Sequence, residues 1–225
     1  MPLADRGRLA VAVPSIPSLT LPAWRLLAAR SLTPGQLEAA AELAAKFLGS
    51  SGADALRADF AAFPGLAIAL TIDGTVAGVA FGHPAAEDGA TPEGITVDDE
   101  HTSRGLGSLL LARFEQAAAD AGYRDVNLGS AGGYVEHFYL KNGYQQAEYM
   151  VVIPDGDRQC LDLGSLEVLR ERRWEPNDLV LNIAAPDGYS QAVKSALEQR
   201  LHASEVCCIF WKPITPAQNQ GGQDR

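Results

Sequence analysis

The segment VDDEHTSRGLGSLLLARFEQAAADAG, residues 97–122, determines the fold class of this chain. Gly105 and Gly107 stand one residue apart in it, at the start of a run whose apolar residues recur at helical spacing and end at Gly122. A helix start presents unpaired backbone N–H groups and the positive end of the helix dipole, and glycine removes side chains that would block an approach. The segment therefore predicts a helix that follows a strand and has an N-terminus at which an anion can bind. The residues expected on its inner face are Leu106, Leu109, Leu110, Phe114, Ala117, Ala118 and Ala121.

The spacing of these glycines matches neither common phosphate-binding fingerprint. The dinucleotide pattern G-x-G-x-x-G would need glycine at Leu110, and no G-x-x-x-x-G-K-(S/T) sequence occurs. A G-x-G pair at a helix start is by itself a weak signal. Two interpretations stay open at this point: a phosphate site, and glycines that merely permit a tight loop.

The composition is typical of a soluble globular protein. The chain has 225 residues, of which 47% are hydrophobic and 20% charged, so it can bury a sizeable core. Asp and Glu number 28 against 18 Lys and Arg, and the net charge of -10 repels phosphate backbones and anionic lipids. We expect no nucleic acid and no membrane partner, and no apolar run approaches the roughly 18 residues of a membrane span. Three cysteines without metal-ligand spacing predict no metal and a cytoplasmic location.

The chain divides into four parts. Residues 1–22 are expected to be an N-terminal extension, because prolines at positions 14, 17 and 22 interrupt the helix that a secretory signal needs. A main domain is expected over residues 23–154 and a C-terminal α/β subdomain over residues 155–212. The polar residues 213–225 are expected to form a flexible tail.

The periodicity of the main domain predicts a mixed α/β sheet flanked by helices. Thr33 and Gln36 form a capping box that begins a helix ending near Leu48, and Asp73 and Gly74 form the turn of an antiparallel hairpin. The expected order is strand, two helices, three strands, helix, strand, helix, strand. The remaining expected elements are a strand over 24–30, a helix over 53–63, strands over 94–97 and 125–131, a helix over 133–142 and a strand over 148–154.

The C-terminal subdomain is expected to have the order αβαβ. Helices are predicted over residues 165–174 and 189–201, the second with Val193, Ala196, Leu197 and Leu201 facing inward, and strands over 178–185 and 205–214. Such apolar strands should not remain exposed edges. The subdomain is therefore expected to extend the main sheet, to build a small lobe, or to supply a homodimer surface.

Two motifs in this order resemble those of the GNAT N-acetyltransferase superfamily. TSRGLG, residues 102–107, resembles the acetyl-coenzyme A loop (Q/R)-x-x-G-x-(G/A), and FYLKNGY, residues 138–144, resembles the segment F-Y-x-x-x-G-(F/Y). The resemblance covers roughly residues 24–154 and implies a GNAT-like, mostly antiparallel sheet with acetyl-coenzyme A as cosubstrate. Thr102 stands where the family prefers Gln or Arg. A second register gives that place to Arg104 but puts Leu109 on the final glycine, so we adopt the first.

The resemblance also implies a set of cosubstrate-binding residues. Backbone N–H groups from Ser103 to Ser108 would hold the pyrophosphate, with Arg104 and Lys141 as nearby positive charges. The strand over 94–97 would meet the pantetheine arm if it parts from the strand over 125–131. The full set is Ile95, Thr96, Val97, Thr102, Ser103, Arg104, Gly105, Leu106, Gly107, Ser108 and Tyr139.

Two side chains are expected to carry the proton transfers. The resemblance makes Tyr139 the general acid that protonates the departing thiolate, although Tyr139 could instead simply pack beside Phe138. Glu93 is the candidate base, because strand alternation puts it on the face of Ile95 and Val97, although a solvated strand-end carboxylate is at least as good an interpretation. His83 and His137 are candidates for the acceptor pocket.

These observations predict an acetyl-coenzyme A-dependent N-acetyltransferase. Its acceptor would be a primary amine, on a small molecule or on a protein lysine or N-terminus, that attacks the thioester directly. The acidic excess mildly favours cationic acceptors. The alternative is a coenzyme A-binding sensor or assembly protein that keeps the GNAT fold without turnover.

Overall fold

A computed structural model of the chain describes residues 24–28, 31–85, 88–130, 132–156, 158–174 and 177–216. The predicted N-terminal extension lies outside these residues, as does most of the predicted tail. The helices are α1 (Pro34–Ala62), α2 (Leu106–Asp120), α3 (Gly133–Lys141) and α4 (Gln191–Arg200). The strands are β1 (Trp24–Ala28), β2 (Ala67–Ile72), β3 (Thr75–Pro84), β4 (Gly89–Val97), β5 (Asp125–Ser130), β6 (Gln145–Ile153), β7 (Val168–Trp174), β8 (Asp178–Ala184) and β9 (Glu205–Pro213).

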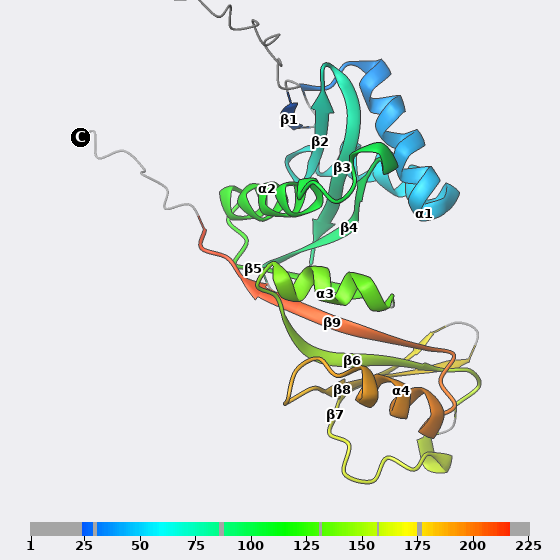
Figure 1. The fold of residues 1–225 in the computed structure, drawn as a ribbon. Helices are drawn as coiled ribbons and strands as arrows, with labels where there is room; N and C mark the ends of the chain where they lie inside the picture. The colour runs from blue at the N-terminus through cyan, green and yellow to red at the C-terminus, as the bar shows by residue number, and fades with distance from the viewer. Residues whose placement is uncertain are drawn as a thin grey trace, which may run out of the picture.

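The described strands form one nine-stranded sheet in the order β1-β2-β3-β4-β5-β9-β6-β8-β7 (Figure 1). Strands β4 and β5 are parallel, and the other neighbouring strands pair antiparallel. The prediction of a mixed, mostly antiparallel sheet flanked by helices is therefore confirmed.

The N-terminal helical region is one element with a kink. Thr33 caps it as predicted, since its side chain accepts from the backbone N–H of Gln36 at 3.2 Å while the Gln36 side chain accepts from the Thr33 N–H at 3.1 Å. The two predicted helices join at Gly49, whose φ of 77° interrupts the helical backbone. Among the residues that the structure describes, no helix combines the length and the apolar character needed to cross a bilayer.

The predicted hairpin between β2 and β3 is confirmed. Asp73 and Gly74 have φ values of 50° and 87°, and positive values at both central residues match a turn whose twist suits adjoining antiparallel strands. This tight connection fixes the register of β2 against β3, and β3 in turn carries β4.

Helices α2, α3 and α4 lie on one face of the sheet and α1 on the other (Figure 1). On the first face, Leu110, Phe114 and Ala118 of α2 are fully buried, in agreement with the predicted inner face. Ala121 is exposed instead, and Leu111 is buried in addition. On the second face, α1 covers β2 and β3, so the helix-covered part of that face ends near β4.

The prediction of a helix over residues 165–174 is wrong, because β7 is a strand over most of it. β7 pairs antiparallel with β8 along its length, and this pairing outweighs the helical propensity of its Leu, Arg and Glu residues. The C-terminal elements are thus ββαβ. β9 lies inside the sheet between β5 and β6, while β8 and β7 extend the sheet beyond β6.

Helix α4 presents a different face from the predicted one. Leu197 and Leu201 are buried as expected, but Val193 and Ala196 are exposed and Lys194 is buried. The helix is turned toward Lys194 because its ammonium group forms an ion pair with a buried carboxylate of α3, described below.

The two adjacent cysteines of β9 should be unreactive in the folded protein. Cys207 and Cys208 are both buried, and burial raises the pKa of each thiol to about 12. Cys160 is exposed. We expect a disulfide reagent at pH 8 to titrate one thiol in the native protein and three in denaturant, because only the thiolate reacts. Rapid reaction of three native thiols would contradict the burial of this strand.

Candidate functional site

The connection from β4 to α2 exposes the start of α2. Ser103 and Gly105 have φ values of 60° and 78°, and these left-handed residues turn the chain into the helix at Leu106. A Cβ atom built on Gly105 would meet nothing within 4 Å. The absence of side chains at Gly105 and Gly107 therefore leaves the first N–H groups of α2 open to approach.

A cavity of about 380 Å³ opens over this helix start, and we refer to it as the loop cavity. It brings together most of the predicted phosphate-binding residues and adds Lys141 of α3 as a positive charge. Arg104 is exposed and does not line the cavity. The lining residues are Val97, His101, Thr102, Ser103, Gly105, Leu106, Gly107, Ser108, Phe138 and Lys141.

A second cavity of about 410 Å³ adjoins the first, and we refer to it as the inner cavity. The two cavities share Val97, Ser103, Gly107 and Phe138, so they form a continuous space from the helix start to α3. The inner cavity is lined by Ile95, Val97, Ser103, Gly107, Val135, Phe138 and Tyr139.

Strands β4 and β5 part beside the inner cavity. They pair at Gly89 with Asp125 and at Ala90 with Val126, and the rest of β4 has no partner residue on β5. Ile95 and Val97 therefore present backbone groups and side chains to the inner cavity. Thr96 lies between them with its buried side chain on the opposite face, so only its backbone is near the cavity.

The two tyrosines of the segment over 138–144 have different surroundings. Tyr139 lines the inner cavity, with its ring 5.2 Å from that of Phe138 and 5.7 Å from that of Phe210. Tyr144 is 2% exposed, and burial together with the nearby carboxylate of Glu115 raises the pKa of its hydroxyl. Tyr144 is thus a core residue, and Tyr139 is the tyrosine that faces the cavity.

Glu93 lies outside both cavities. The register between β3 and β4 shifts at Phe81 and Gly82, which leaves Glu93 as the extra residue of a β-bulge. Its carboxylate lies 4.0 Å from Nδ1 of His83, which lies 3.8 Å from the Asp59 carboxylate of α1. The alternation that placed Glu93 on the face of Ile95 and Val97 does not hold across the bulge.

Asp59 is a member of this group that the sequence analysis missed. It lies on α1, far from Glu93 in the sequence, and no motif marks it. Burial raises the pKa of its carboxyl group, while the imidazole of His83 acts in the opposite direction. Asp59, His83 and Glu93 therefore lie close together on the α1 face of the sheet.

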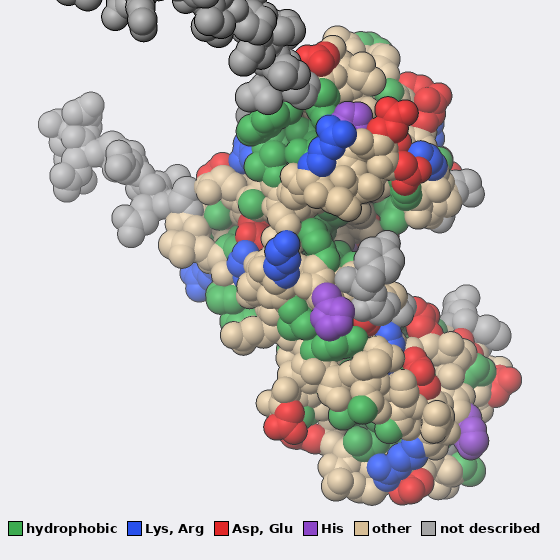
Figure 2. All heavy atoms as spheres, viewed as in Figure 1, with side chains coloured by type: hydrophobic (Ala, Val, Ile, Leu, Met, Phe, Trp, Pro, Cys, Tyr) green, Lys and Arg blue, Asp and Glu red, His purple; other side chains and the backbone are tan. Residues whose placement is uncertain are grey.

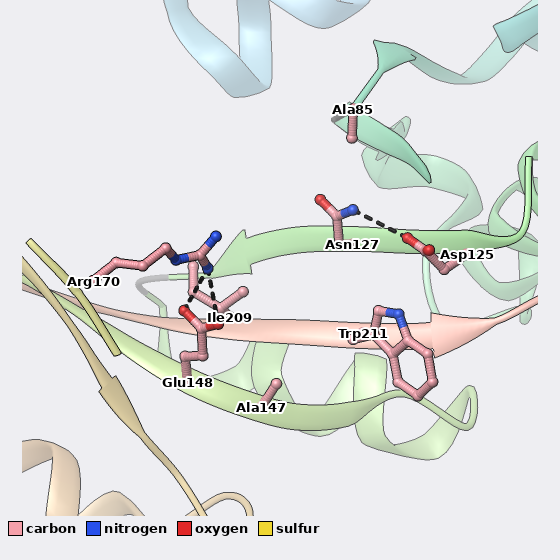
Figure 3. A pocket seen from close by; sticks show the side chains of 8 residues that line it. All are labelled: Ala85, Asp125, Asn127, Ala147, Glu148, Arg170, Ile209 and Trp211. Carbon is pink, nitrogen blue, oxygen red and sulfur yellow. Dashed lines mark hydrogen bonds and ion pairs between the residues drawn. The ribbon is translucent and has the colours of Figure 1, made fainter. Parts of the chain in front are cut away.

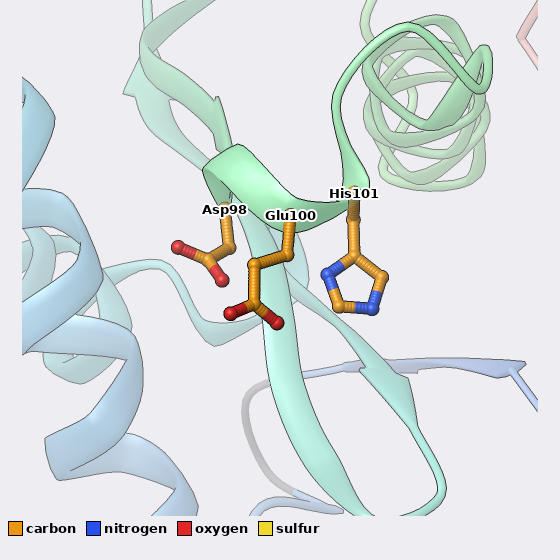
Figure 4. Close-up of side chains that lie close together, drawn as sticks. All are labelled: Asp98, Glu100 and His101. Carbon is orange, nitrogen blue, oxygen red and sulfur yellow. The ribbon is translucent and has the colours of Figure 1, made fainter.

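The turn that precedes the loop cavity carries a cluster of possible metal ligands. Side-chain ligand atoms of Asp98, Glu100 and His101 lie within 4.8 Å of one another (Figure 4). Asp98 is already paired with Lys46 at 3.1 Å, and this contact lowers the pKa of Asp98. The expectation that the protein uses no metal stays a prediction.

Positive charge around the site is sparse. In the space-filling view, Lys and Arg side chains lie scattered among acidic ones on this face and form no continuous patch (Figure 2). An anion at the start of α2 would therefore depend mainly on backbone N–H groups, as the sequence analysis predicted for the pyrophosphate.

Helix α3 is held in place by a buried ion pair. Nζ of Lys194 on α4 lies 2.9 Å from Oε1 of Glu136, and the two side chains are 5% and 0% exposed. The Tyr189 hydroxyl donates to the other oxygen of Glu136 at 3.3 Å. Because Glu136 points to α4 while Val135 and Tyr139 line the inner cavity, this pair fixes the rotation of α3.

Comparison with known proteins identifies the part of the chain that builds this site. Residues 65–146 match the family model described as the acetyltransferase (GNAT) domain. This part of the chain is therefore similar to the acetyltransferase domain of the GNAT superfamily. The matched residues include the helix start, the parting strands and Tyr139, whereas β7, β8, α4 and β9 lie beyond them.

Solved structures show the same GNAT fold. The ribosomal-protein-S18-alanine N-acetyltransferase of Escherichia coli superposes with a TM-score of 0.51 and is 17% identical in sequence. The alignment covers 88% of this chain and 98% of the Escherichia coli chain. Ard1 of Thermoplasma volcanium superposes with a TM-score of 0.51 and is 14% identical, in an alignment that covers 85% of this chain and 97% of the Ard1 chain. No curated protein matches the chain in sequence.

Breaking the ion pair that holds α3 should strongly destabilise the protein. Lys194→Met leaves the Glu136 carboxylate buried without its charged partner, and we expect a loss of about 3–5 kcal/mol in the free energy of unfolding. The double variant Glu136→Leu/Lys194→Met should recover most of that loss, because it removes both charges. Urea unfolding measures both changes.

Lys46→Met is the matched control, because Lys46 pairs with Asp98 and Asp99 at the surface. Its effect on the free energy of unfolding should be far smaller than that of Lys194→Met, because solvent screens an exposed ion pair. Equal stability of Lys194→Met and the unmodified protein would show that the buried pair does not hold α3.

Proposed function

We propose that this protein is an acetyl-coenzyme A-dependent N-acetyltransferase that transfers the acetyl group to a primary amine by direct attack. One observation carries the proposal: the open start of α2, the unpaired edge of β4 and Tyr139 all face one continuous space. This space offers, in order, an anion site, an extended channel and a proton donor.

The cosubstrate would bind along this space from the surface inward. Backbone N–H groups of residues 103–108 would hold the pyrophosphate, with Lys141 as the cation of the loop cavity. The pantetheine arm would pair with the free edge of Ile95–Val97, much as a strand adds to a sheet. Thr102 lines the loop cavity where the family prefers a longer side chain. Its short hydroxyl would contribute less to pyrophosphate binding than a Gln or Arg side chain would.

The chemistry would need two proton transfers at the inner end. The neutral amine attacks the thioester carbon, the C–N bond forms, and the C–S bond then breaks to release a thiolate. Tyr139 donates its hydroxyl proton to the sulfur. The proton lost by the amine nitrogen passes to Glu93 through water, because Glu93 lies outside the inner cavity beside His83.

Acetyl-coenzyme A binding tests the assignment of the helix start. Gly107→Trp should abolish binding in a calorimetric titration, because the indole would fill the space shared by the two cavities. A Cβ atom at Gly107 meets only the Phe138 ring, at 3.4 Å, so the substitution should leave the fold intact. Ala112→Trp, on the exposed side of the same helix, is the control and should bind like the unmodified protein.

Thiol release during an amine screen tests turnover in the same samples. Acetyl-coenzyme A binding with acceptor-dependent thiol release would establish the transferase. Binding without thiol release in the presence of any amine would favour the alternative, a coenzyme A-binding sensor or assembly protein without turnover. Unchanged affinity of Gly107→Trp would remove the helix start from the site.

Tyr139→Phe should lower kcat by about 100-fold or more while leaving acetyl-coenzyme A affinity unchanged, because loss of a general acid typically costs 10²–10⁴-fold. Steady-state kinetics with a good acceptor and calorimetry measure the two quantities. Tyr123→Phe, outside both cavities, is the control for removing a hydroxyl from this domain. An unchanged kcat in Tyr139→Phe would exclude Tyr139 as the acid.

A further inference from the structure

A third cavity, of about 360 Å³, lies on the opposite face of the sheet from the inner cavity, and we refer to it as the sheet-face cavity (Figure 3). Its floor is formed by β5, β9 and β6, and β7 supplies one charged side chain at its end. It is lined by Ala85, Asp125, Asn127, Ala147, Glu148, Arg170, Ile209 and Trp211.

Strand alternation separates the two faces. On β9, Phe210 packs against Tyr139 of α3, so its neighbours Ile209 and Trp211 point to the other side of the sheet. On β5, Val126 and Leu128 are buried in the core under α2, so Asp125 and Asn127 point away from it. The sheet-face cavity and the inner cavity are thus on opposite sides of the same strands.

The parting of β4 from β5 connects the two sides. The last paired residues are Ala90 and Val126, and the Thr91 hydroxyl then donates to Oδ1 of Asn127 at 2.9 Å. Beyond this bond β4 has no partner on β5. Asn127 therefore stands in the sheet-face cavity at the point where the gap between the strands begins, with Ile95 and Val97 on the far side of that gap.

One end of the sheet-face cavity carries a guanidinium group with donors to spare. Nη2 of Arg170 lies 2.8 Å from both carboxylate oxygens of Glu148, and Asn182 donates to Glu148 at 2.6 Å. Within the described part of the chain, these contacts of Arg170 use Nη2 alone, and Nη1 points into the cavity (Figure 3). The N–H groups of Nη1 and Nε are suited to a carboxylate ligand.

The other end is acidic and aromatic. Asp125 accepts from the Asn127 amide through one oxygen at 3.2 Å, and the Trp211 indole lies beside them on β9 (Figure 3). A cationic group would find a carboxylate and a π face here. Gly129 of β5 pairs with Ile209, and Ile209 pairs with Glu148, so Gly129 marks the basic end of the cavity on β5. Asp125 marks the acidic end, four residues earlier on the same strand. At the usual rise per strand residue, the two ends are about 13 Å apart.

From this arrangement we propose that the sheet-face cavity binds the amine acceptor, and that the acceptor is a free α-amino acid with a cationic side chain. Arg170 binds the α-carboxylate and Asp125 with Trp211 binds the side-chain cation. The α-amine then lies between the two ends, over the gap through which it reaches the thioester. A polyamine fits less well, because it would bring positive charge against Arg170.

This inference rests on the proposed function and is tested with the full-length protein and a matched pair of acceptors. L-arginine and L-argininamide each carry one primary amine and the same side chain, and they differ in the carboxylate. We expect the unmodified protein to acetylate L-arginine with a kcat/KM at least tenfold higher than L-argininamide. Arg170→Lys, which keeps the charge but loses the planar fork, should abolish that preference by raising KM for L-arginine.

Arg172→Lys is the control, because Arg172 lies two residues along the same strand, contacts Asn182, and does not line the cavity. It should keep the preference. Asp125→Asn is a second, independent variant and should lower kcat/KM for L-arginine relative to L-alanine. Thermal unfolding of each variant shows whether a change in KM reflects loss of fold.

The outcomes separate this inference from the proposed function. Acetyl-coenzyme A-dependent turnover with equal kcat/KM for the acid and the amide, or a preference unchanged in Arg170→Lys, would overturn the acceptor assignment and leave the transferase standing. Absence of acetyl-coenzyme A binding in calorimetry would overturn the proposed function itself. Turnover with spermidine exceeding that with L-arginine would show that the cavity selects polyamines.

Discussion

The candidate site is organised around the parting of β4 and β5. Two parallel strands that stay paired for two residues leave backbone donors and acceptors unsatisfied along their inner edges, and such groups need a partner. Closing the sheet would satisfy them, but β5 is held on its other side by β9 along its whole length, from Asp125 to Ser130. The gap is therefore maintained by the sheet, and the start of α2 and the side chains of α3 lie beside it on one face. The extended pantetheine arm of the proposed cosubstrate would be a suitable partner for the free edge of β4.

Local signals made much of the fold predictable. The capping box at Thr33, the turn at Asp73 and Gly74, and the apolar period of α2 each depend on a few neighbouring residues, and each appears where the sequence placed it. The elements that the sequence misplaced depend on contacts with other elements. Residues 168–174 form a strand because β8 is beside them, and α4 is rotated because Glu136 of α3 attracts Lys194. The strand that became β8 was predicted, but the helical propensity of residues 168–174 concealed their pairing with it. Lys194 and Glu136 lie 58 positions apart, and spacing along the chain does not link them.

In the candidate site, too, the parts formed by neighbouring residues were predictable and the parts formed by separate elements were not. The helix start and Tyr139 lie in contiguous motifs, and the structure brings them to adjoining cavities, although their roles stay predictions. The group of Asp59, His83 and Glu93 comes from three separate elements and is created by a β-bulge, which shifts strand alternation by one residue. A bulge leaves no reliable mark in a single sequence. Strand alternation therefore predicts the face of a side chain least reliably next to a bulge, where the strand changes direction.

The C-terminal elements β7, β8, α4 and β9 contribute to the candidate site although they lie beyond the residues that match the family model. The residues that match the GNAT domain end at 146, before most of β6, yet β9 completes the sheet beside β5 and α4 holds α3 through a buried charge. The face proposed to bind the cosubstrate is thus built by the matched residues and stabilised by the later ones. On the opposite face, Trp211 and Arg170 of these later elements line the sheet-face cavity. A protein that keeps one cosubstrate while changing acceptors would be expected to vary the second face alone, because the first is constrained by the cosubstrate. The location of the charged pair Glu148 and Arg170, on the face away from α2, is consistent with this separation of binding and selection.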